Sequence, residues 1–212
     1  MGKDHTVLEN NRQFQEMFSS VRDRLQVREP GDIARCTGMD WNGTYFAVCS
    51  FGVQLQISWP DCTITPAQDM WNTLVLLQYM LYADGAALTE RYISLCEFRE
   101  GGLVRGNSFD RENDRIIRGI GKHDATLIRR AAARLGGEEL RGKADLSFRF
   151  WFLPRYPMQL NLWLEDEEFP ASGKILLEAA TESSLQVEAA GMLSGVLLEN
   201  LRKICEQMGS EI

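Results

Sequence analysis

Apolar residues recur along the chain with two different periods, one typical of helices and the other typical of strands. Spacings of three and four residues predict a polar amphipathic helix over 6–27 and a largely buried helix over 65–85. The same spacing predicts two helices within 110–135, which break near Gly119 and Gly121, and a final helix from 183 onward.

Residues that favour helix starts stand before two of these segments. Thr65 is expected as the N-cap of the buried helix, with Pro66 in its first position and Gln68 completing a capping box. Ser183 and Gln186 form the same pattern before the last helix. We therefore expect the two helices to begin at these residues.

Alternation of apolar and polar residues predicts two β-hairpins, one over 44–59 and one over 146–164. Shorter strands are expected at 91–98 and at 174–179. In the second hairpin, the apolar residues are even-numbered in both strands, and residues opposite each other must lie on the same face of the sheet. That constraint favours an odd-length loop from 153 to 157, which would place Phe150 opposite Leu160 and Arg149 opposite Asn161.

The order of these elements predicts an α+β fold. We expect a mainly antiparallel sheet, built from the two hairpins plus extra strands, with helices packed on it. A chain of 212 residues fits one large domain, 1–212, in which the N-terminal helix is peripheral.

The net charge and the cysteine spacing argue against several classes of function. A net charge of −7 and a pI near 5.0 argue against nucleic-acid binding and against docking on anionic lipid. No apolar run reaches the length of a membrane helix. The five cysteines include no C-x-x-C pair, so we expect reduced thiols in a cytoplasmic protein.

Four consecutive acids follow the second hairpin: Glu165, Asp166, Glu167 and Glu168. If the strand continued through them, two would point into the core, where unpaired carboxylates are too costly. Either the strand ends by 165 and the acids form a solvated turn, or they line a cavity with basic partners. Asp166 and Glu168 are weak metal candidates in the second case. Arg149 and Lys174 are the nearer basic partners, because Arg155 falls at the opposite end of the strand.

Charges are also segregated along the chain. Residues 164–212 hold ten acids and three bases, whereas residues 105–143 hold ten bases and six acids. The two segments are either solvated faces of opposite charge, or a basic groove for an anionic ligand, or complementary faces of a homodimer.

The segment "LPRYPMQLNLWLEDEEFPASGKILLE" resembles the signature of a prokaryotic family, the domain of unknown function 3786. The likeness extends to "LLQYMLYADGAALTERYISLCEF" and to "ARLGG", so that the family-like core covers about 45–201. The family motifs point to candidate ligand-binding residues. These are Asp84, Glu97, Arg155, Asp166, Glu167 and Glu168.

The resemblance implies a setting rather than an activity. The family occurs largely in anaerobes, and some members carry a separate four-cysteine module resembling that of corrinoid iron–sulfur proteins. This chain lacks the module, so no intrinsic iron–sulfur cluster is expected, and the cofactor is not identified. A corrinoid or iron–sulfur protein is the partner that the resemblance suggests.

Three functions compete on this basis. The first is a non-enzymatic ligand-binding or accessory domain for anaerobic cofactor metabolism, which requires a large, partly apolar pocket. The second is a carboxylate-based, divalent-cation-dependent enzyme acting on a polar small molecule, which requires Asp166 or Glu168 in a cleft with Arg155. The third is a structural oligomerising protein, which requires an extensive apolar interface.

Overall fold

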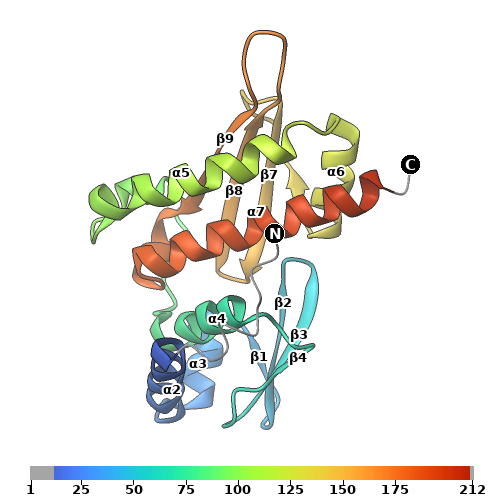
Figure 1. Ribbon diagram of the computed structural model, residues 1–212. Helices are drawn as coiled ribbons and strands as arrows, with labels where there is room; N and C mark the ends of the chain where they lie inside the picture. The colour runs from blue at the N-terminus through green and yellow to red at the C-terminus, as the bar shows by residue number, and fades with distance from the viewer. Residues whose placement is uncertain (1–11, 211–212) are drawn as a thin grey trace.

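The computed structural model describes residues 12–210 and contains two antiparallel sheets with helices packed on them (Figure 1). One sheet has the strand order β1-β2-β3-β4 and the other the order β5-β9-β8-β7-β6. The α+β class is confirmed. The two predicted hairpins, however, lie in separate sheets rather than in one.

The strands of the first sheet are β1 Asp40–Trp41, β2 Tyr45–Ser50, β3 Val53–Ser58 and β4 Ile64–Thr65. Those of the second are β5 Tyr92–Ile93, β6 Glu138–Glu139, β7 Leu146–Leu153, β8 Tyr156–Trp163 and β9 Ser172–Glu178. The sheets meet where the N–H of Phe51 donates a 3.0 Å hydrogen bond to the carbonyl of Trp151. The turn of the first hairpin is therefore fixed to the end of the second.

The helices are α2 Arg12–Gln26, α3 Pro30–Thr37, α4 Met70–Tyr82, α5 Gly102–Ile120, α6 Ala125–Arg134 and α7 Val187–Gly209. Two short 3₁₀ helices are η1 Leu95–Glu97 and η2 Ala179–Ser183. Figure 1 shows α5 and α7 running side by side across the larger sheet, with both N-termini at the same end. Within residues 12–210, no helix is both long enough and apolar enough to cross a membrane.

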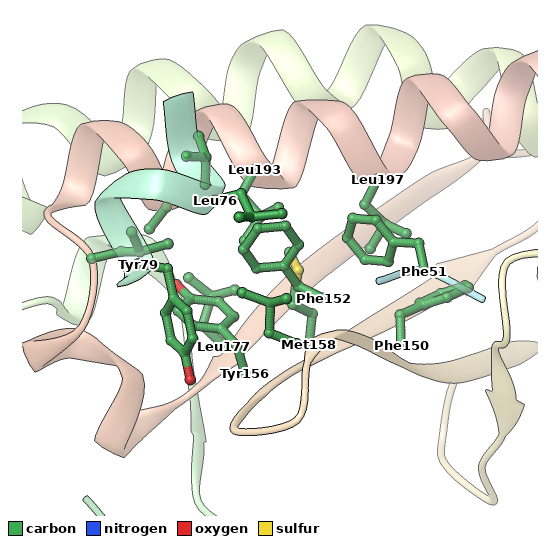
Figure 2. Packing of buried hydrophobic residues seen from close by; sticks show 14 of the residues in the cluster. Phe51, Leu76, Tyr79, Phe150, Phe152, Tyr156, Met158, Leu177, Leu193 and Leu197 are labelled. Carbon is green, nitrogen blue, oxygen red and sulfur yellow. The ribbon is translucent and has the colours of Figure 1, made fainter. Parts of the chain in front are cut away.

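A group of aromatic rings packs among leucine side chains in the buried interior (Figure 2). Phe152 lies against Phe51, Tyr79 and Tyr156, with ring centroids 5.6–6.4 Å apart. The edge-to-face contacts of Phe152 with Tyr79 and Tyr156 add to the stabilisation from burial. Phe150, expected on the buried face, is fully buried.

The predicted starts of two helices are wrong. Thr65 pairs with Gln56 as part of β4, and Asp69 caps α4 by accepting the N–H groups of Trp71 and Asn72. A strand pairing has overridden the local capping signal. The last helix begins after Gln186, because the residues from 179 to 183 form the 3₁₀ helix η2.

The second hairpin has the predicted buried face but not the predicted register. Phe150 lies opposite Met158, and Arg149 lies opposite Gln159, two residues from the expected pairing. The connecting turn has two residues instead of five, and the pairing shifts by one residue between Trp151 and Leu153. Because of this one-residue shift, even-numbered residues of both strands still share the buried face although the turn has an even number of residues.

Two further segments depart from expectation. The strand expected at 91–98 is limited to Tyr92–Ile93 and gives way to η1. The first helix of the 110–135 pair starts earlier, at Gly102, and the break before α6 falls at 121–124. The N-terminal helix is confirmed from Arg12 onward, while the predicted portion at 6–11 lies outside the described residues.

Candidate functional site

The turn Pro154–Arg155 connects β7 to β8 and packs against two other parts of the chain. Nη1 of Arg155 donates a 2.7 Å hydrogen bond to the main-chain carbonyl of Gly85, which lies just beyond α4. A Cβ on Gly38, at the end of α3, would lie 3.1 Å from Cβ of Pro154. The turn thus joins the larger sheet to the ends of α3 and α4.

Asp84 and Gly85 shape the loop that Arg155 contacts. Gly85 has a left-handed backbone, with φ +80°, and a Cβ there would lie 3.3 Å from Cα of Cys36. Oδ1 of Asp84 accepts the N–H of Ala86 at 2.9 Å, which lowers the pKa of this carboxyl group. The conformation of the turn Ala83–Asp84–Gly85, called the A-D-G turn below, therefore depends on both Asp84 and Gly85.

A buried carboxylate, Glu178, fixes the other end of this loop. Its Oε1 accepts the N–H of Thr89 at 2.5 Å and the Thr89 hydroxyl, and its Oε2 accepts the N–H of Ala180 at 2.7 Å. Only 1% of Glu178 is exposed. Because a buried carboxylate is tolerated only when it is hydrogen-bonded, this group rigidly joins the end of β9 to the 84–91 loop.

A cleft of about 760 Å³ opens beside the loop. Its walls come from the end of α4 and the following loop, from the connection between η1 and α5, and from the segment between η2 and α7. Phe98, Leu185 and Val187 supply buried apolar surface. The cleft lies at the end of the molecule where α5 and α7 both begin (Figure 1).

Polar groups stand at the rim of the cleft. The carboxylate of Glu182 accepts the main-chain N–H of Arg99, and its second oxygen lies 3.9 Å from Nε of Arg99. Both long helices start here without a side-chain cap on their N-terminal N–H groups, at Gly101 and Gln186. The cleft therefore combines an apolar wall with available main-chain donors.

Tyrosines Tyr79 and Tyr156 lie edge to face, 5.8 Å apart, in the buried core near Arg155 (Figure 2). Burial raises the pKa of Tyr79 and of Tyr156 above the usual range of a phenol. Both hydroxyls therefore stay protonated at neutral pH.

The acidic stretch forms an exposed turn between β8 and β9. β8 ends at Trp163, so the strand stops before Glu165, in agreement with one of the two alternatives. Oδ1 of Asp166 accepts the N–H groups of Glu168 and Phe169 at 2.9 and 2.7 Å, which lowers the pKa of the Asp166 carboxyl group. The Asp166 side chain thus orders the tip of the turn. The start of the turn is bonded to distant residues, because the N–H of Leu164 donates to Oδ2 of Asp145 at 2.9 Å and the N–H of Glu165 donates to the carbonyl of Gly121 at 3.4 Å.

The basic partners expected for this turn are engaged elsewhere. Nη2 of Arg149 lies 2.5 Å from Glu138 on β6, and Nζ of Lys174 lies 3.4 Å from Asp110 on α5. The expectation that these cations pair with the acids is therefore wrong. Arg155 does lie at the opposite end of β8, as predicted.

Glu97 and the metal candidates have local roles. Oε2 of Glu97 accepts the N–H and the hydroxyl of Ser94 at 2.8 Å each, which completes a capping box and lowers the pKa of Glu97. Asp166, Glu167 and Glu168 are exposed. Among residues 12–210, no three His, Cys, Asp or Glu side chains form a group that could hold a metal ion.

All five cysteines are free thiols. Burial raises the pKa of Cys62 and of Cys205 to about 11, so both are poor nucleophiles at neutral pH. Burial and the neighbouring Asp110 carboxylate also raise the pKa of Cys96.

A model of the family DUF3786, described as a domain of unknown function, matches residues 29–200. The chain belongs to this family. The match covers Arg155, the A-D-G turn, the cleft and the acidic turn, so all of these features belong to the DUF3786 region. Neither the curated proteins nor the solved structures contain a match to the chain.

Sequence reasoning found part of this arrangement and missed the rest. Of the six predicted residues, only Asp84 and Arg155 shape the loop beside the cleft. The missed residues are Glu178 and Glu182, which join the walls of the cleft. The available signal was the position of Glu178 at the end of an apolar strand, where a carboxylate needs partners.

Proposed function

We propose that the protein is a non-enzymatic module that binds a small molecule in the cleft between the 82–86 loop, the start of α5 and the start of α7. The observation that carries this proposal is the cleft itself. Its volume of about 760 Å³ falls within the range of pockets that bind small molecules. Its walls are held together by the buried carboxylate of Glu178.

The lining favours a ligand with an apolar part and hydrogen-bond acceptors. Phe98 and Leu185 suit the apolar part. The N-terminal N–H groups of α7 and the guanidinium of Arg99 suit acceptor oxygens or nitrogens. In agreement with the family resemblance, we further propose that the ligand belongs to anaerobic cofactor metabolism, with a corrinoid or iron–sulfur protein as partner.

The carboxylate-enzyme alternative has less support. It calls for Asp166 or Glu168 in a cleft with Arg155, whereas these acids lie on an exposed turn at the far end of β8. The cleft lining includes acids, but Glu182 is engaged with the main chain of Arg99 and Glu188 lies 3.3 Å from Arg105. A ligand-binding role fits this arrangement better than acid–base catalysis.

The test is to purify the protein without oxygen, record its absorbance spectrum and identify released small molecules by mass spectrometry after denaturation. The variant Ala86→Trp fills the cleft from its loop wall, and Ala133→Trp places the same bulk on an exposed site of α6. We expect a bound molecule in the wild type and in Ala133→Trp, and a loss of at least tenfold in Ala86→Trp. A wild type that releases nothing, or equal retention in both variants, would contradict the proposal.

A further inference from the structure

The C-terminal turn of α4 forms part of the cleft wall and is held from outside by an arginine. Tyr82, the last residue of α4, lines the cleft together with Ala86. The last carbonyl groups of a helix have no partner within the helix itself. Nη1 of Arg28 donates to two of them, those of Met80 and Leu81, at 2.9 and 2.6 Å. Arg28 thus fixes the main chain from which the Tyr82 side chain extends.

A second arginine, Arg24 of α2, holds the Tyr82 ring itself. Its Nη1 donates a 2.8 Å hydrogen bond to the phenol oxygen, and its guanidinium carbon lies over the ring, 5.2 Å from the centroid. The second contact is a cation–π contact. Because a tyrosine side chain turns about only two torsions, a contact at its oxygen and another on its face select one ring position.

These contacts join α2 to a site that lies outside it. α2 precedes the residues matched by the DUF3786 model, 29–200, whereas Tyr82 and the other residues that line the cleft all fall within them. Arg24 is exposed and Tyr82 is half-buried, so the pair lies at the surface, where the ring has room to move once Arg24 is removed.

We propose that Arg24 is a positioning residue for the ligand of the cleft, because it holds the Tyr82 ring in the wall. A ring that turned freely would either enter the cleft or leave its wall open, and both would weaken binding. This inference rests on the proposed function and adds that α2 controls the cleft from outside the DUF3786 region.

The first experiment observes the ring directly. The chain has five tyrosines, so ring-¹³C-labelled tyrosine gives a simple NMR spectrum, in which the variant Tyr82→Phe assigns Tyr82. Arg24→Met removes the guanidinium and keeps an unbranched stem. We expect it to shift the Tyr82 resonances and to leave those of the buried Tyr79 and Tyr156 unchanged, which also verifies that the variant folds.

Two matched variants control for the loss of charge. Arg24→Lys keeps the charge and a donor, so the Tyr82 resonances should return most of the way to their wild-type positions. Arg35→Met makes the same change on α3, where the guanidinium bonds to Asp32 at 2.9 Å, and should leave the Tyr82 ring unchanged.

The second experiment measures the small molecule that each variant retains after purification without oxygen, by mass spectrometry of the denatured protein. Arg24→Met should retain about fivefold less than the wild type, the loss expected when one hydrogen-bonded contact is removed. Arg24→Lys and Arg35→Met should retain nearly as much as the wild type. Tyr82→Ala should also lose the molecule, and adding Arg24→Met to it should cause no further loss, because Arg24 acts through the ring.

Three results would overturn the inference alone: an unshifted Tyr82 ring in Arg24→Met, full retention in that variant, or a further loss when Arg24→Met is added to Tyr82→Ala. In each case the wild type still retains its molecule, so the proposed function stands. A wild type that releases nothing would refute the proposed function, and this inference with it, whatever the ring resonances show.

Discussion

The two turns at opposite ends of β8 carry the most distinctive charged motifs of the chain, but they differ in what they contact. The turn at Pro154–Arg155 contacts Gly38 and Gly85, more than a hundred and about seventy positions earlier in the chain, respectively. In the turn that begins after Trp163, the Asp166 side chain binds N–H groups two and three residues away. Only the main chain at the start of this turn, at Leu164 and Glu165, bonds to distant residues, Asp145 and Gly121.

The difference lies in the charged side chains, because Arg155 bonds to a distant loop whereas Asp166 bonds only within its own turn. Four adjacent carboxylates suggest a binding site, yet they are exposed and their cationic partners lie elsewhere. A single arginine in a two-residue turn instead holds the loop that forms a wall of the cleft. The sequence distance that the charged side chain spans, rather than the density of charge, distinguishes the two motifs.

The largest expected effect contrasts two phenylalanines, one near each turn. Phe152 packs among aromatic rings and is 1% exposed, whereas Phe169 is 66% exposed. Phe152→Ala should lower the free energy of unfolding by about 3–5 kcal/mol, because it leaves a cavity in the core. Phe169→Ala should change it by no more than about 0.5 kcal/mol. Urea denaturation measures both, and equal losses would contradict the comparison.

A smaller effect is expected at the glycine that Arg155 contacts. Gly85→Ala should cost about 2 kcal/mol, because a Cβ is strained at positive φ and approaches Cys36. The matched change Gly31→Ala lies in α3 with open space around it and should stabilise by about 0.5 kcal/mol. If both variants have the same thermal midpoint, the loop conformation described above is wrong.

The smallest effect concerns pH. Main-chain N–H groups lower the pKa of Asp84 and of Asp166 in the folded state. Each carboxylate therefore stabilises the fold above the unfolded pKa of about 3.9, and this contribution is lost as the pH falls through the lowered folded pKa. Asp84→Asn and Asp166→Asn should be slightly less stable than the wild type at pH 7.

The difference should shrink by pH 3 for both variants, as urea denaturation at the two pH values would reveal. The two turns should behave alike in this respect, since the same local chemistry acts in each. A destabilisation that stays constant between pH 7 and pH 3 would show that the charge is not responsible.

Local periodicity predicted most elements of the fold but not the details that depend on distant partners. The buried faces of β7 and β8 follow from alternation alone. Their register does not, because the irregularity near Phe152 coincides with the contact between Trp151 and Phe51 of the other sheet. Thr65 was likewise predicted as a cap, although pairing with Gln56 places it in a strand.

The candidate site was predictable only in part, for the same reason. Arg155 and Asp84 were found through motifs, and their meeting through Gly85 depends on the packing of α3 and α4 against the hairpin turn. Glu178 and Glu182 each bind main-chain groups more than eighty residues away. The position of Glu178 at the end of an apolar strand indicates that its carboxylate needs partners, but nothing in the neighbouring sequence indicates which residues they are.

The central claim is that Arg155 controls the loop beside the cleft while Asp166 controls only its own turn. Native-state amide hydrogen exchange tests it most directly. In Arg155→Met, which removes the bond to Gly85 and keeps an apolar stem, exchange should accelerate at Ala86 and Thr89 and stay unchanged at Phe169. In Asp166→Asn, exchange should accelerate at Phe169 and stay unchanged at Ala86. Acceleration at Phe169 in the first variant, or no change at Ala86, would contradict the account.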